Sequence, residues 1–182
     1  MMGVSLNSSI FFFCLIVLTS GCKKNSDVSV DEYIFNELKS QDVDINGDQI
    51  MDFRIDYNRL VTDDYPSSGK SWIGFIQSLN KNAILYKPNY GNLFLQEKDT
   101  VFSVSTATRI WSPYPADLLT NSGKDAAWAI LAPNTITDYY LGFKLSAQNQ
   151  IGWMKVNIHK STGMVTLVNK KLAGADFIVI EE

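Results

Sequence analysis

Residues 154–167 read MKVNIHKSTGMVTL, and this stretch decides the fold class. Its apolar residues recur at every second position on both sides of a polar interval; they are Met154, Val156, Ile158, Val165 and Leu167. A period of two is typical of β-strands, whose successive side chains point to opposite faces. The interval Lys160–Gly163 (KSTG) is a short loop with a glycine, which indicates a hairpin. The stretch therefore predicts two half-buried antiparallel strands.

The same period recurs along the chain. Its apolar positions are Phe53, Ile55, Tyr57, Leu141, Phe143 and Leu145, and the residues expected on the opposite face include Tyr140, Lys144 and Ser146. Further strands are expected at 71–79, 83–86, 100–107, 127–131 and 177–180. Short helices are expected only at Ala116–Thr120 and Asp31–Leu38. Strands separated by turns, with few short helices, predict an all-β antiparallel β-sandwich of the jelly-roll or immunoglobulin-like kind.

The first residues carry a different signal. Ile10–Leu18 is an unbroken apolar run, too short to span a bilayer, which needs about 20 residues in a helix. Its length fits the hydrophobic core of a secretory signal peptide, and small residues follow it before Cys22. We therefore expect a signal segment at 1–21, a polar tether at 22–30 and one β-sandwich domain at 31–182.

The residues before Cys22 read LTSGC, which resembles a bacterial lipobox. The resemblance implies acylation of Cys22, cleavage before it, and a lipid anchor in the bacterial membrane. Lys23 rather than aspartate after the cysteine fits sorting to the outer membrane in that family. The match departs at Thr19, where leucine is usual, and in the lack of Lys or Arg before the apolar run. An ordinary secreted protein with a chance cysteine is the alternative.

Charge and cysteine content exclude several classes. The formal net charge is −3 and there is no run of Lys or Arg, which argues against nucleic acid as a partner. The cysteines are Cys14, inside the signal segment, and Cys22, the expected lipid site. A mature chain without a free thiol forms neither a disulfide nor a zinc–thiolate site.

Residues 44–53 read DINGDQIMDF and resemble the calcium loops of dockerin-like and FG-GAP-type extracellular modules. Calcium takes six to eight oxygens, and a loop supplies them from alternate side chains and one carbonyl. The ligands implied here are Asp44, Asn46, Asp48, the carbonyl of Ile50, and Asp52. The departure is Gln49, which occupies the position of the family glycine, where φ is usually positive and a Cβ costs roughly 1 kcal/mol.

The alternative for this loop is a turn without metal, because Asn, Asp and Gly are turn residues in their own right. If calcium binds, the expected role is structural: it braces the start of the strand at Phe53.

Three segments in order resemble a group of uncharacterised lipoproteins and secreted β-proteins of Bacteroidota: the acidic loop, YLGFKL at 140–145 and IGWMKV at 151–156. That resemblance implies a β-sandwich and brings no established activity.

Candidates for chemistry are few. His159 is the sole histidine, so a Ser-His-Asp triad and a multi-histidine metal site are not indicated, and we expect His159 to face solvent near a turn. The segment WSPYP at 111–115 is expected to be a rigid loop that holds Trp111 and Tyr114 among prolines, where flat rings could stack on sugars or partners or could cap the ends of the sandwich. The sequence favours a non-enzymatic envelope module that binds a glycan or an envelope protein or has a structural role. The alternative is a glycan-binding or carbohydrate-active component of a polysaccharide-utilisation system.

Overall fold

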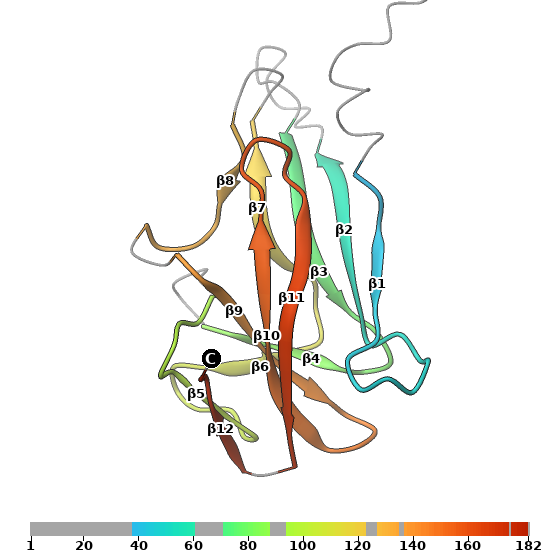
Figure 1. Cartoon of the computed structure of the whole chain (residues 1–182), viewed down its shortest axis with the longest axis vertical. Helices are drawn as coiled ribbons and strands as arrows, with labels where there is room; N and C mark the ends of the chain where they lie inside the picture. The colour runs from blue at the N-terminus through green and yellow to red at the C-terminus, as the bar shows by residue number, and fades with distance from the viewer. Residues whose placement is uncertain are drawn as a thin grey trace, which may run out of the picture.

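Figure 1 shows the computed structural model of the chain, which describes residues 38–60, 71–87, 94–122, 127–134, 137–174 and 176–181. Within these residues the chain forms strands and no helix. The described residues therefore include no helix long and apolar enough to cross a membrane. The signal segment 1–21, Cys22 and the tether lie outside the described residues, as does nearly all of the helix expected at Asp31–Leu38.

The strands form two five-stranded antiparallel sheets and one two-stranded antiparallel sheet. The first sheet has the order β1 (Gln41–Val43), β2 (Phe53–Leu60), β3 (Ser71–Ser78), β7 (Ala116–Asn121), β8 (Ala129–Ile130). The second has the order β11 (Val165–Ala173), β10 (Gln150–Ile158), β9 (Tyr139–Leu145), β4 (Ala83–Tyr86), β6 (Ile110–Ser112). The third pairs β12 (Phe177–Val179) with β5 (Thr100–Phe102).

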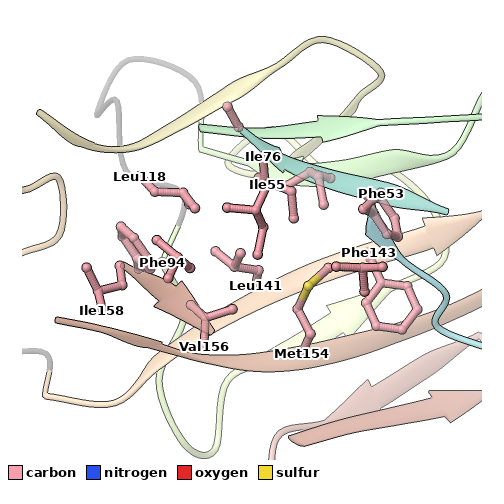
Figure 2. Packing of buried hydrophobic residues seen from close by; sticks show 14 of the residues in the cluster. Phe53, Ile55, Ile76, Phe94, Leu118, Leu141, Phe143, Met154, Val156 and Ile158 are labelled. Carbon is pink, nitrogen blue, oxygen red and sulfur yellow. The ribbon is translucent and has the colours of Figure 1, made fainter. Parts of the chain in front are cut away.

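The main core lies between the first and second sheets. Figure 2 shows side chains of β2, β3 and β7 pointing toward those of β9 and β10. Phe53 and Phe143, one from each sheet, meet with ring centroids 5.9 Å apart. The predicted apolar faces of β2, β9 and β10 all supply this core, which confirms the β-sandwich.

A second core lies on the other face of the second sheet, beneath β5 and β12. It contains Leu85, Leu95, Val101, Tyr140, Ile151, Trp153, Ile178 and Ile180. Tyr140, expected on the polar face of its strand, is fully buried here, with its ring 5.5 Å from that of Trp153. The prediction for Tyr140 is therefore wrong. It assumed that each strand has only one buried face, whereas the β5–β12 sheet covers the second face of β9 and β10.

Three local predictions are also wrong. Ala116–Thr120 is not a helix but lies within β7, where Ala116 and Leu118 are buried and Asp117 is exposed. The strand expected at 100–107 ends at Phe102, after which the N–H of Thr106 bonds the carbonyl of Arg109 and turns the chain. Trp111 lies in β6 rather than in a loop.

The KSTG hairpin is confirmed: it joins β10 to β11, with His159 N–H donating to the Met164 carbonyl at 2.9 Å. Gly163 has a φ of 74° and lies against the Trp128 ring, where a Cβ would stand 2.3 Å from Cε2. Glycine is therefore required both by the backbone conformation and by the close approach.

Candidate functional site

Three loops meet at one end of the sandwich, and we call them the loop pole: residues 44–52, 79–82 and 146–149. The Asn80 side chain donates to the Met51 carbonyl at 2.9 Å, which joins the first loop to the second. Ser146 Oγ donates to the Lys81 carbonyl at 2.5 Å, which joins the second loop to the third. The pole therefore links turns from both large sheets.

The acidic loop is ordered by its own side chains. Asp44 accepts the N–H groups of Gly47 (2.7 Å) and Gln49 (2.8 Å). Asn46 Oδ1 accepts the N–H of Asp48 at 2.9 Å, and the Asn46 amide donates to Asp48 Oδ2 at 2.9 Å. Asp48 Oδ1 accepts the N–H of Ile50 at 2.8 Å. The side chains of Asp44, Asn46 and Asp48 thus hold the loop backbone; Asp48 and Ile50 are exposed, whereas Asp44 and Asn46 are half-buried.

Two residues of this loop have left-handed backbone conformations: Gly47, with φ 80°, and Gln49, with φ 68°. Gln49 stands where the calcium loops that this segment resembles have glycine, and it adopts the positive φ that is usual for that glycine. The Gln49 N–H bond to Asp44 contributes to holding this conformation.

The loop stabilises the charge on Asp44. Desolvation acts to raise the pKa of Asp44, but the N–H groups of Gln49, Gly47 and Asp48 and the charge of Lys170 outweigh it, so this pKa is lowered. Lys170, from β11, also donates to the Asp44 carbonyl at 2.9 Å. Protein donors and one lysine therefore balance part of the negative charge of the loop.

Asp52 differs from the other four implied ligands because it is buried under the loop. Its Oδ2 accepts the Ile45 N–H at 2.8 Å and its Oδ1 accepts the Asn82 amide at 3.0 Å. Asn82, only 2% exposed, also accepts the Ser146 N–H at 2.9 Å. Asn82 therefore connects the acidic loop of the first sheet to the β9–β10 turn of the second.

Asn82 and Lys170 were not singled out in the sequence. The only local signal was the turn residues of S-L-N-K-N-A at 78–83, where Asn80 and Lys81 have positive φ. The partners of Asn82 lie 30 and 64 residues away, so no local pattern indicates its role.

The implied ligands other than Asp52 are the carbonyl of Ile50 and the side chains of Asp44, Asn46 and Asp48, which accept N–H groups of the loop itself. Among the described residues, no three His, Cys, Asp or Glu side chains gather closely enough to hold a metal, because Asp52 is turned inward. Calcium with these four ligands would need water for the remainder of its shell.

The other candidate residues are dispersed. His159 is exposed next to the KSTG turn as expected, with Nδ1 3.1 Å from both Ser161 Oγ and Thr162 Oγ1. Trp111 is partly buried against the second core, and its indole N–H donates to the Phe102 carbonyl at 3.2 Å. Tyr114 is 74% exposed.

Comparisons with protein-family models, with curated proteins and with solved structures find no match to this chain.

Proposed function

We propose that this chain is a lipid-anchored outer-membrane module of a bacterial envelope, which acts by binding a partner or as a structural part rather than by catalysis. The observation that carries the anchor is the LTSGC sequence at 18–22. Several acyl chains on Cys22 hold a protein to a membrane firmly, because each buried CH₂ contributes about 0.8 kcal/mol.

The described N-terminal end and the loop pole lie at opposite ends of the first sheet. The described chain begins at Leu38, and Ser40 bonds Asp56 at 2.7 Å, near the middle of β2. β1 then runs toward the acidic loop, so the loop pole lies at the end of the sandwich away from residue 38 (Figure 1).

Mass spectrometry of the mature amino terminus tests the anchor directly. We expect an N-terminal Cys22 carrying diacylglycerol and an N-acyl chain, and we expect Cys22→Ser to move the protein from the membrane fraction to the soluble fraction. An unmodified Cys22 in the mature protein would overturn the proposal.

We also propose that the acidic loop binds calcium in a structural role. Support comes from the four implied ligands other than Asp52, of which Asp48 and Ile50 are exposed, and from the positive φ of Gln49, the conformation that the loop family uses at this position. The bound ion would brace the turn that leads into β2 at Phe53. It would add no reactive group.

Glycan binding is the second candidate, and the exposed ring of Tyr114 favours it. We expect Tyr114→Ala to abolish retention on a polysaccharide while the domain stays folded. Lack of binding across a glycan panel would remove this candidate.

A further inference from the structure

The acidic loop contains a chemically reactive pair of residues, Asn46 and Gly47, which is the sole Asn-Gly sequence in the chain. The main-chain nitrogen that follows an asparagine can attack the side-chain Cγ of that asparagine and close a succinimide ring. Glycine favours this attack because it has no Cβ to hinder a close approach of the main chain. Gly47 is exposed, and a Cβ built there would meet nothing within 4 Å, so water reaches the pair.

The reaction consumes only water. The bond between Gly47 N and Asn46 Cγ forms, the bond between Cγ and Nδ2 breaks, and Nδ2 leaves as ammonia with the proton of the Gly47 N–H. Water then opens the ring. Breaking the bond between Gly47 N and Cγ gives aspartate at position 46, and breaking the bond between Gly47 N and the main-chain carbonyl carbon gives isoaspartate. Both products have a carboxylate in place of the amide.

Asp44 opposes the first step. The Gly47 nitrogen becomes a nucleophile only when its N–H loses the proton, and this N–H donates to Asp44 Oδ1 at 2.7 Å. Desolvation acts to raise the pKa of Asp44, but the loop N–H groups and Lys170 outweigh it, so Asp44 is ionised at neutral pH and is a weak base. A negative charge that forms on the Gly47 nitrogen beside this carboxylate is disfavoured.

The amide of Asn46 is held by Asp48. Its Oδ1 accepts the Asp48 N–H at 2.9 Å, and its Nδ2 donates to Asp48 Oδ2 at 2.9 Å. Both ends of the amide are thus fixed on Asp48, and the side chain has to release them to bring Cγ onto the Gly47 nitrogen. The closed loop therefore restrains both reacting groups.

Local opening of the loop controls the rate for this reason. A slow step that occurs only in a locally open state proceeds in proportion to the population of that state. Residues 47–50 are all exposed, and side chains of the same loop accept the N–H groups that hold them. The loop can therefore open without unfolding the two large sheets.

The product changes the contact with Asp48. The bond from Asn46 Nδ2 to Asp48 Oδ2 is replaced by two carboxylates, which repel each other. Asp48 Oδ2 also accepts the amide of Gln148 at 3.4 Å, from the third loop of the pole. Conversion therefore weakens the loop pole where its first and third loops meet.

We propose that Asn46 is a deamidation site controlled by the acidic loop. The closed loop preserves the amide, and each opening lets the Gly47 nitrogen convert it to a carboxylate. The new carboxylate then weakens the closed form, so the conversion is a one-way loosening of the loop pole. This inference depends on neither the lipid anchor nor calcium, because it uses only water and bonds within the protein.

Peptide mapping by mass spectrometry of the purified full chain, incubated with excess chelator, measures the conversion at position 46. We expect the folded chain to convert at least about tenfold more slowly than the chain unfolded in guanidinium chloride. Asp44→Ala should convert about tenfold faster than the folded original, because it removes the bonds to the N–H groups of Gly47 and Gln49. Circular dichroism confirms that the variant is folded.

Asp42→Ala is the matched control, because it removes an exposed carboxylate whose partner is Arg54, outside the loop. We expect Asp42→Ala to convert at the original rate when folded, and all three chains to convert equally when unfolded. Equal rates in the folded and unfolded original chain would overturn the proposal. A slower conversion in Asp44→Ala would also overturn it, since Asp44 would then act as a base that promotes the reaction.

Asn46→Asp tests the loosening by the product. With excess chelator present, we expect its melting temperature to fall by about 2–4 °C, because one hydrogen bond is lost and a repulsion is gained. Asn149→Asp adds the same charge at an exposed position of the third loop and should leave the melting temperature unchanged. Equal melting temperatures for Asn46→Asp and the original chain would refute the loosening of the loop pole.

Discussion

At the scale of single residues, Gly163 is set both by its backbone and by its neighbour. Its φ is 74°, and a Cβ would stand 2.3 Å from Trp128 Cε2 and 2.6 Å from Nε1. Gly163→Ala therefore forces a rigid indole to move and adds left-handed strain, and we expect a loss of about 2–4 kcal/mol of unfolding free energy. Urea denaturation followed by tryptophan fluorescence measures this loss.

Gly174→Ala is the matched control, because a Cβ there would meet nothing within 4 Å. We expect its free energy of unfolding to stay within about 0.5 kcal/mol of that of the original chain. Equal losses for the two variants would refute the packing argument at Gly163.

Gln49 is a non-glycine residue in a left-handed backbone conformation, which glycine adopts at lower cost. The sequence marked Gln49 as a departure from the loop pattern that it resembles, which has glycine there, and the φ of 68° shows that Gln49 adopts the left-handed conformation. Gln49→Gly should raise the unfolding free energy by about 0.5–1 kcal/mol. Gln49→Ala keeps a Cβ in the left-handed region and should not raise the unfolding free energy. An equal increase in both variants would show that the effect comes from loss of the glutamine side chain and not from the backbone conformation.

At the scale of elements, the sequence predicted best where a strand has one buried face. Alternation located β2 and β10 correctly, and the bounds of β4 agree with the expected 83–86. It failed for Tyr140 in β9, which is buried by a layer formed from residues about 40 positions away on either side. It also failed for β7, because a short apolar run such as ADLLT has no clear period and its pairing with β3 decides its conformation.

The hydrogen bonds of the Asn82 side chain to Asp52 and Ser146 were not predictable from local sequence, yet they join elements of both large sheets. Asn82→Ala leaves Asp52 Oδ1 and the Ser146 N–H without this partner, and we expect a loss of about 1–3 kcal/mol. Ser146→Ala removes only the exposed hydroxyl bond to Lys81 and should cost less than about 1 kcal/mol. Thermal unfolding by circular dichroism compares the two; equal losses would contradict the role of Asn82.

Asn82→Asp tests the same contact between residue 82 and Asp52 through the pH dependence of stability. The new carboxylate would face buried Asp52, so repulsion and burial raise the pKa of the pair in the folded state. Stability is then present at acidic pH and lost as pH rises through that raised pKa. We expect a larger deficit at pH 7 than at pH 5, whereas a deficit independent of pH would show that the carboxylates are well separated.

At the scale of the whole molecule, the sequence predicted a sandwich but not its third layer. The β5–β12 sheet is built from two strands of three residues each, far apart in the chain. Its position depends on Leu85, Tyr140 and Trp153 filling the second core, which are contacts that no local period encodes. The candidate loop shows the same limit: the pattern located Asp44, Asn46 and Asp48, whereas the inward turn of Asp52 depends on Asn82 from another element.

Calcium binding would act on the whole molecule through the loop pole, because the acidic loop is bonded to turns of both large sheets. A ligand that binds only the folded state stabilises it by about 2.7 kcal/mol at 100 times its dissociation constant. We expect millimolar calcium to raise the melting temperature relative to excess chelator. Asp48→Asn should abolish most of the rise, because it removes the exposed carboxylate among the implied ligands. Magnesium should give a smaller rise, since it demands a more rigid octahedral shell. Identical melting curves in calcium and in chelator would show that the loop is a turn held by its own N–H bonds and by Lys170.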